Sequence, residues 1–307
     1  MQRSRKQKRK RNDKNTNGTE CIDQMIRYTN RKDKYKQLNK ELKKLNNMIG
    51  MEELKNAVVS QIQFIMTNKG DLDDHFLNTC LMGPPGSGKT SVAEILYNIW
   101  MSMGIFDAET PFTILHRADF VGTYMGHTAN KTKKLLQKHS GGVLFIDEAY
   151  ALMNGEKDDY GREAIDTLNG FLSEEKGKTI VIIAGYKDEL DDQFFGANSG
   201  LRRRFGWNFT IRKYSANELY SIFVSQLHNH GWTCSNDVKK LFVDNYEKFV
   251  MGGGDTENIC FKAKLQYSKK NWWKAKQSKK LSFEHVKEAM EAHFVNKERE
   301  ISHNMYI

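Results

Sequence analysis

Apolar residues along the chain follow two spacings, and the two spacings alternate. Continuous apolar runs, typical of buried strands, occur at residues 76–82, 113–116, 143–146, 179–184 and 207–211. Between them, apolar residues recur every three or four positions, which predicts helices over 90–103, 128–139 and 162–174. This alternation of strand and helix predicts an α/β fold, with a parallel sheet and helices on both faces.

The two flanks of the alternating region are predicted to be helical. Residues 21–47 carry apolar side chains at helical spacing among many lysines. After residue 214 no further strand is predicted, and Ser215 with Glu218 forms a capping box that starts a helix. The predicted organisation is a disordered tail (1–20), a helical lead-in (21–47), an α/β domain (48–213), a small all-helical domain (214–300) and a C-terminal tail (301–307).

A glycine-rich stretch follows the first predicted strand. It is Gly83-Pro84-Pro85-Gly86-Ser87-Gly88-Lys89-Thr90, which matches the phosphate-binding pattern G-x-x-x-x-G-K-[ST]. Backbone N–H groups of such a loop cradle phosphates, and the next helix adds the positive end of its dipole. Lys89 is expected to reach the β- and γ-phosphates, and Thr90 to ligate Mg²⁺. The alternative is a glycine-rich turn, but the strand before it and the helix after it favour a nucleotide site.

Two acids follow the third predicted strand. Asp147 and Glu148 come directly after the apolar run 143–146, so they are expected at the carboxyl end of a buried strand. In a nucleotide site Asp147 would hold Mg²⁺ and Glu148 would act as general base on the attacking water. By themselves the two acids would indicate only a turn at a strand end.

Two further segments are candidates for the same site. Arg202, Arg203 and Arg204 precede the fifth strand. In isolation they would be a solvated charge cluster, but beside a P-loop they suggest arginine fingers, chiefly Arg204 and Arg202, that reach the γ-phosphate of a neighbouring subunit. Ile49 and Gly50 form an apolar turn that would line an adenine pocket, although alone they mark only a helix start.

Charge and composition bound the environment of the chain. The 307 residues are 39% hydrophobic and 28% charged, with a net charge of +10. Residues 1–14 hold eight basic side chains against Asp13 alone, and so supply +7 of that charge. The tail is compatible with a nuclear-localisation signal, a nucleic-acid contact or a solvated tail without a partner. No apolar run is long enough for a membrane span, and the four separated cysteines favour a reducing compartment, cytoplasm or nucleus.

A second basic stretch lies in the C-terminal part. Residues 269–276 combine lysines with Trp272 and Trp273, a composition found on nucleic-acid surfaces. The alternative is a helix end with buried tryptophans and lysines that extend to solvent.

The combined motifs resemble AAA+ ATPases, specifically the family of the red-type Rubisco activase (CbbX) and the stage V sporulation protein K. The likeness covers about residues 45–215 and rests on 48–50, 83–90, 118–133, 141–150, 163–168, 184–188 and 200–205. The resemblance implies a ring, usually a hexamer, that binds ATP and Mg²⁺ between subunits, with a helical lid. It also implies that Tyr124, Met125 and Gly126 form a pore loop whose aromatic ring grips a polypeptide; the alternative is a tyrosine packed under the loop.

Two positions depart from patterns found in AAA+ proteins. Tyr186 follows the fourth strand, where many AAA+ proteins place an asparagine that senses the γ-phosphate; the family that the chain resembles shares this difference, so the resemblance does not imply a sensor role for Tyr186. Asp255 lies near the position of a lid arginine, for which Lys262 or Lys264 could substitute.

The resulting hypothesis is an ATP-hydrolysing ring that remodels or threads a client protein. Its rivals are a nucleic-acid motor or loader on the same fold, a monomeric P-loop kinase, and a nucleotide-gated scaffold with weak turnover.

Overall fold

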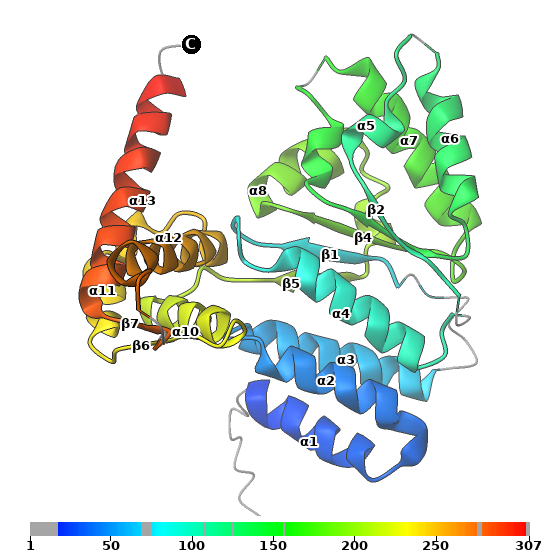
Figure 1. Ribbon diagram of the computed structural model, residues 1–307. Helices are drawn as coiled ribbons and strands as arrows, with labels where there is room; N and C mark the ends of the chain where they lie inside the picture. Colours follow the sequence, from blue (N-terminus) through cyan, green and yellow to red (C-terminus); the bar gives the residue numbers. More distant parts are fainter. Residues whose placement is uncertain are drawn as a thin grey trace, which may run out of the picture.

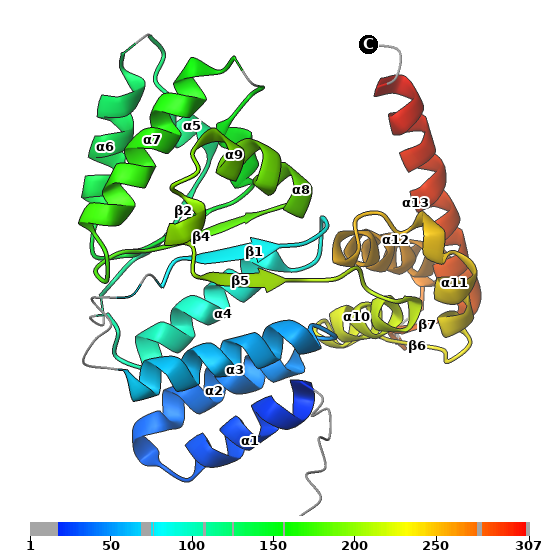
Figure 2. The same cartoon turned by 180° about the vertical axis from the view of Figure 1, so that it is seen from behind.

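The computed structural model of the chain (Figures 1 and 2) describes residues 18–68, 75, 77–106, 109–124, 126–155, 157–274 and 278–304. The basic tail up to residue 17 and Met125 of the expected pore loop lie outside the described residues. Within the described residues the fold is α/β, with a parallel sheet covered by helices on both faces and a helical C-terminal part, as the sequence predicts.

Five short strands form the central sheet, in the order β2-β3-β4-β1-β5. They are β1 (Thr79–Met82), β2 (Phe112–Leu115), β3 (Val143–Ile146), β4 (Ile180–Gly185) and β5 (Trp207–Thr210). Neighbouring strands all run parallel, and β1 pairs with both β4 and β5. The carboxyl ends of the strands therefore share one edge of the sheet, and the amino ends share the other.

Side chains of the strands point alternately into two hydrophobic cores. Leu81 and Phe145 lie in the first core, whereas their sequence neighbours Cys80 and Ile146 lie in the second. The first core is closed by α2 (Lys36–Asn47), α3 (Glu52–Thr67) and α4 (Lys89–Ser102), and the second by α6 (Thr128–Lys138) and α7 (Asp159–Glu174). Figure 1 shows these two sets of helices on opposite sides of the sheet.

The N-terminal helices are an integral layer of the first core. Helix α1 (Gly18–Asn30) begins inside the stretch expected to be a tail, and Ile22 and Leu42 of α1 and α2 are completely buried. The buried amide of Asn39 donates to the carbonyl of Ile26 at 2.8 Å and to the hydroxyl of Thr29 at 2.9 Å. These bonds hold α2 to α1, so the lead-in is packed and not loosely attached.

Short helices connect the larger elements on the second face. They are α5 (Arg117–Phe120), η3 (Ala149–Leu152), α8 (Lys187–Glu189), η4 (Leu190–Phe194), α9 (Phe195–Ala197) and η5 (Arg202–Arg204); η1 (Asp33–Tyr35) lies between α1 and α2. The sequence pattern did not resolve them, because each is too short to show a helical period.

The C-terminal part is helical, with one small addition. Its elements are α10 (Ala216–His228), β6 (Thr233–Cys234), α11 (Val238–Asp244), η6 (Tyr246–Lys248), α12 (Gly253–Asn271), β7 (Lys280–Leu281) and α13 (Phe283–Asn304). The predicted capping box is present, since Ser215 Oγ accepts from the Glu218 N–H and Glu218 Oε2 accepts from the Ser215 N–H. The short parallel pair β6–β7 was not expected, and α13 continues into the segment expected to be a tail.

In the described part of the chain, no helix combines the length and the apolar character that a membrane crossing requires. Cys21, Cys80, Cys234 and Cys260 are all free thiols, as the separated spacing predicts, and burial raises the pKa of Cys80 and of Cys260 to about 12.

Asn78, just before β1, links that strand to β4 and to η5 at the amino edge of the sheet. Its buried side chain accepts from the N–H of Val181 at 2.9 Å and donates to the carbonyl of Arg204 at 3.0 Å. We expect Asn78→Ala to lower the free energy of unfolding by about 1–3 kcal/mol, because the Val181 N–H would lose its partner in a buried position. Urea denaturation, monitored by circular dichroism, measures the free energy of unfolding. Asn98→Ala, which removes an exposed side-chain bond in α4, is the control, and equal stability of the two variants would contradict the prediction.

Candidate nucleotide-binding site

The glycine-rich loop joins the carboxyl end of β1 to the start of α4, as the sequence predicts. Gly86 and Gly88 have φ angles of +61° and +87°, which glycine adopts without strain. Gly83 has no room for a side chain, because a Cβ there would lie 2.9 Å from the carbonyl oxygen of Ile211. The Gly83 N–H donates to the carbonyl of Gly185 at 3.1 Å, so the loop starts fixed between β4 and β5.

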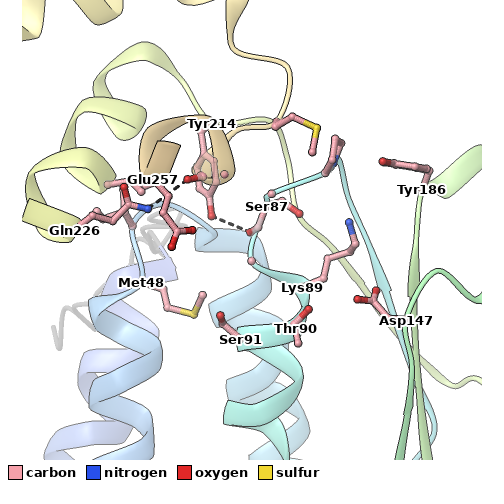
Figure 3. A pocket seen from close by; sticks show the side chains of 18 of the residues that line it. Met48, Ser87, Lys89, Thr90, Ser91, Asp147, Tyr186, Tyr214, Gln226 and Glu257 are labelled. Atoms are coloured by element: carbon pink, nitrogen blue, oxygen red, sulfur yellow. Dashed lines mark hydrogen bonds between the residues drawn. The ribbon is translucent and has the colours of Figure 1, made fainter. Parts of the chain in front are cut away.

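Lys89 is held over the loop by the loop's own backbone. Its Nζ donates to the carbonyls of Gly83 and Pro84, each at 2.9 Å, and lies 5.4 Å from the centre of the Tyr186 ring. Burial lowers the pKa of Lys89, and the nearby carboxylate of Asp147 counteracts this shift. Figure 3 shows the ammonium group on the side of the cavity that faces Asp147 and Tyr186. The side chain is therefore placed where an incoming anion would meet a positive charge.

The two acids lie at the carboxyl end of β3, beside this lysine. Asp147 and Glu148 both line the cavity, and the Glu148 N–H donates to Asp147 Oδ1 at 3.0 Å. Glu148 has a φ of +50°, an uncommon conformation for a residue with a side chain. Thr90 lines the same cavity from the first turn of α4 (Figure 3). A hydroxyl and a carboxylate fit Mg²⁺, which binds one or two protein oxygens and takes its other ligands from phosphate and water.

The cavity has a volume of about 610 Å³, within the range of small-molecule sites. Of the residues proposed from sequence, it is lined by Ile49, Pro85, Gly86, Ser87, Gly88, Lys89, Thr90, Asp147 and Glu148. Gly83 and Pro84 are not in the lining and contribute through the carbonyls that hold Lys89. Gly50 is also outside it: it has a φ of +70° and lies against Glu218, whose Oε1 would be 2.6 Å from an added Cβ.

Sequence reasoning missed the residues that close the cavity from the C-terminal side. Tyr214 is buried, and its hydroxyl donates to the carbonyl of Ser87 at 2.8 Å across 127 positions of sequence. Met48 lines the cavity next to Ile49, and Gln226 and Glu257 line it from the C-terminal side (Figure 3). No local pattern identifies them, since a lone tyrosine or glutamine in a helical region carries no signal of its distant partner.

A pair of tyrosines covers the end of the cavity nearest the acids. The rings of Tyr150 and Tyr186 stack with centres 5.6 Å apart. Burial raises the pKa of both hydroxyls, and the negative charges of Glu148 and Glu189 raise it further. Both tyrosines therefore stay protonated at neutral pH and are available as hydrogen-bond donors beside Glu148. Tyr186, which follows β4, thus lines the cavity on the side of the acids.

The lid supplies no basic side chain to the cavity. Lys89 is the one basic residue that lines it within the described part of the chain. Lys262, a candidate substitute for the missing lid arginine, donates instead to the carbonyl of Ala292 in α13 at 3.3 Å. Lys264 is also absent from the lining. The idea that one of these lysines takes over the role of the arginine therefore finds no support in the geometry.

The arginine cluster lies at the opposite edge of the sheet. The carbonyl of Arg204 accepts from Asn78, which precedes β1, whereas the phosphate loop follows β1. Arg204 donates to Ser173 Oγ at 2.7 Å and to the carbonyl of Gly200 at 2.7 Å. Arg202 forms an ion pair with Asp191 at 2.7 Å. Neither arginine lines the cavity of its own chain.

Tyr124 projects from the surface. Its side chain is 67% exposed, and its ring meets only the edge of His127 among the described aromatic contacts. Gly126 has a φ of +76° with open space around it. The alternative of a tyrosine packed under the loop is wrong.

The two tryptophans at the end of α12 are also exposed, by 76% for Trp272 and 61% for Trp273. The interpretation as buried tryptophans is therefore wrong, and the lysines around them flank an open aromatic surface.

Comparison with known proteins gives a consistent result. Residues 79–206 match the family described as "ATPase family associated with various cellular activities (AAA)". The chain is 36% identical over 236 residues to a putative cfxQ-like protein of Acanthamoeba polyphaga mimivirus, covering 75% of this chain and 58% of the relative. It is 34% identical over 203 residues to the stage V sporulation protein K of Bacillus subtilis, covering 64% and 62%. It is 36% identical over 215 residues to a chloroplastic cbbX homologue of Guillardia theta, covering 67% and 57%.

The chain thus spans about three fifths of the length of these relatives. Among solved structures, the AAA domain of FIGL-1 in complex with ADP matches with a TM-score of 0.58 at 17% identity, over 80% of this chain and 82% of that chain. At this identity the likeness concerns the fold alone.

Gly86 touches the C-terminal part so closely that a side chain there cannot be accommodated. A Cβ would lie 1.9 Å from the carbonyl oxygen of Met251. We expect Gly86→Ala to weaken MgADP binding about tenfold or more, because strain of this kind costs about 1–3 kcal/mol. Titration with a fluorescent nucleotide measures the effect. Gly141→Ala, with a similar φ of +79° and nothing within 4 Å, is the matched control. Unchanged binding by Gly86→Ala would contradict the prediction.

Proposed function

We propose that this chain uses ATP hydrolysis in its cavity to remodel a client protein. The chain belongs to the AAA family of ATPases, and within it to the type represented by CbbX and the stage V sporulation protein K. Family membership makes residues 79–206 an ATPase domain. The observation that carries the proposal is the convergence of the phosphate loop, the acid pair and the lid on one cavity. The ADP in the FIGL-1 domain of similar fold supports a nucleotide as the occupant.

Each residue of the cavity has a proposed role. Backbone N–H groups of Gly86 to Thr90 cradle the phosphates, and Lys89 meets the β- and γ-phosphates. Thr90 and Asp147 would hold Mg²⁺, which supplies charge neutralisation when it is bound. Glu148 takes a proton from the water that attacks the γ-phosphorus, while the bond to the bridging oxygen breaks and ADP leaves.

The position of the arginines supports an active site shared between two chains. The strand β1 separates Arg204 from the phosphate loop, and four residues of strand extend over about 13 Å. Arg204 therefore cannot reach the phosphates of its own chain without unfolding the sheet. An oligomer, for which the family resemblance suggests a hexameric ring, would bring Arg204 and Arg202 to a neighbour's γ-phosphate. The exposed ion pair of Arg202 with Asp191 is of a kind that costs little to exchange.

The exposed Tyr124 supports contact with a client polypeptide. An aromatic side chain that is 67% exposed offers apolar area and a hydrogen-bond donor to a polypeptide. Movement of the lid against the α/β part on hydrolysis would displace the loop that carries Tyr124.

The nucleic-acid alternative keeps one specific observation in its favour, the exposed Trp272 and Trp273 among lysines. Of the other rivals, a kinase would transfer the phosphate to a metabolite instead of to water, and the scaffold predicts very slow turnover.

Complementation between two inactive variants tests the shared site. We expect Glu148→Gln to stop hydrolysis by removing the base, and Arg204→Ala to lower it about 10³-fold or more by removing the finger. Mixing the two should restore activity, because a site with Glu148 from one chain and Arg204 from the other is complete. Steady-state phosphate release measures the ATPase activity of the mixture across a range of mixing ratios.

Arg203→Ala, which changes an exposed arginine of the same cluster, is the control and should retain activity. A mixture that stays inactive, although the two variants co-assemble in analytical ultracentrifugation, would exclude a site shared between chains. Specific activity that does not depend on protein concentration would count equally against it.

A trap experiment identifies the client. Glu148→Gln should bind ATP and retain its client, because hydrolysis and release are blocked. We expect mass spectrometry of the complex isolated from host extract to find a defined protein, and Tyr124→Ala in the same background to lose it. Retention of nuclease-sensitive nucleic acid, lost on replacement of Trp272 and Trp273, would overturn the proposal in favour of the nucleic-acid alternative.

A further inference from the structure

The lid touches the phosphate loop through backbone atoms. The N–H of Gly253, at the start of α12, donates to the carbonyl of Gly86 at 2.9 Å. Gly252 has a φ of +47°, and an added Cβ on Gly253 would lie 2.9 Å from the same carbonyl. The turn formed by residues 251–254, here called the glycine turn, therefore needs small residues to approach the loop this closely.

A second external hydrogen bond holds the next peptide of the loop. The hydroxyl of Tyr214 donates to the carbonyl of Ser87 at 2.8 Å (Figure 3). Tyr214 is itself fixed, because its carbonyl accepts from the hydroxyl of Tyr246 at 2.9 Å. Two successive carbonyls of the phosphate loop, those of Gly86 and Ser87, are thus held by groups from the C-terminal side.

These two bonds fix the direction of the amides that an anion would use. In a planar trans peptide, the carbonyl and the following N–H point in opposite directions. When the Gly86 carbonyl is held by the glycine turn, the Ser87 N–H points away from that turn. When the Ser87 carbonyl is held by Tyr214, the Gly88 N–H points away from Tyr214. Both residues line the cavity, so the external bonds orient its anion-binding donors.

The glycine turn is in turn held by a buried acid. Asp255 is 1% exposed, and its Oδ2 accepts from the Met251 N–H at 2.6 Å. Its Oδ1 lies 2.9 Å from Nε2 of His293, a residue of α13 that is 9% exposed. A carboxylate buried this deeply is stable only when its oxygens are hydrogen-bonded, which ties the turn firmly to α13. Asp255 occupies the first turn of α12 and is not among the residues that line the cavity.

We propose that Tyr214, Asp255 and His293 are positioning residues that hold the amides of Ser87 and Gly88 in the orientation that binds the nucleotide's phosphates. The lid thereby acts on the phosphate loop through the peptide backbone, in place of a charged side chain at the phosphate. This inference rests on the proposed nucleotide site. Its distinctive consequence is that ADP and ATP are affected alike, since the oriented amides belong to the loop and not to a γ-phosphate contact.

The test compares nucleotide affinities of single variants in the full chain. We expect Tyr214→Phe, Asp255→Ala and His293→Ala each to raise the Kd for MgADP and for the non-hydrolysable analogue MgAMP-PNP by the same factor, about three- to tenfold. Asp255→Asn should recover most of the affinity, because its amide oxygen can still accept from the Met251 N–H. Asp255→Ala and His293→Ala should be non-additive when combined, because they break the same link.

A control variant separates positioning from general loosening of the lid. His285→Ala removes a histidine that caps α13 through Ser282, far from the phosphate loop in the chain of contacts, and is the matched control. It should keep the wild-type Kd even where thermal stability falls. Hydrogen exchange should show faster exchange of the amides of residues 251–256 in Asp255→Ala and not in His285→Ala.

The outcomes distinguish this inference from the proposed function. Wild-type protein that binds neither nucleotide would overturn both. Wild-type binding with unchanged affinity in the three variants would overturn the inference alone. A loss of affinity confined to MgAMP-PNP would also overturn the inference, because it would assign the three residues to the γ-phosphate. An equal loss of affinity in His285→Ala would overturn it too, because the effect would then be general destabilisation.

Discussion

Burial of both faces of the central sheet is the constraint on which the rest of the structure depends. All residues of β1, β3 and β4 are buried, so these three central strands present no exposed side chain from either face. Polar chemistry is confined to the two edges, where strands become loops. The phosphate loop, Asp147 and Glu148 lie at the carboxyl edge, and the arginine cluster lies at the amino edge. Because rigid strands separate the edges, the arginine cluster and the phosphate loop cannot meet within one chain.

The parts of the site that sequence predicts are those set by adjacent residues. A phosphate loop needs glycines at fixed offsets and a lysine at the start of a helix, so its pattern is visible in eight positions. Asp147 is placed by the buried run before it, because a continuous apolar strand ends where a polar residue follows. The parallel sheet follows from the alternation of strands and helices, since parallel neighbours require crossover connections. The short helices and the β6–β7 pair were missed because each is too short to show a period in the sequence.

The parts that sequence does not predict depend on contacts between distant segments. Tyr214 meets Ser87 across 127 positions, and Asp255 meets His293 across 38. A sequence window shows the residue type but not the partner, so Asp255 was considered only as a departure from a family pattern. The exposure of a side chain has the same limit: Trp272 and Trp273 are apolar enough to be buried, yet both are exposed in the structure. Packing also makes the N-terminal helices part of the core.

A lid that acts through backbone contacts changes where the nucleotide state is sensed. A basic side chain on the γ-phosphate would make the lid bind ATP more tightly than ADP, because the charge acts on a group that ADP lacks. Oriented loop amides act on phosphates that both nucleotides share, so they raise affinity without discriminating. In the proposed shared site, discrimination would fall to groups beyond the loop, namely Glu148 and Tyr186 of the same chain and the arginines of a neighbour. Two of these contacts would come from the α/β part that binds the nucleotide and the third from another chain, so none of them would depend on the lid.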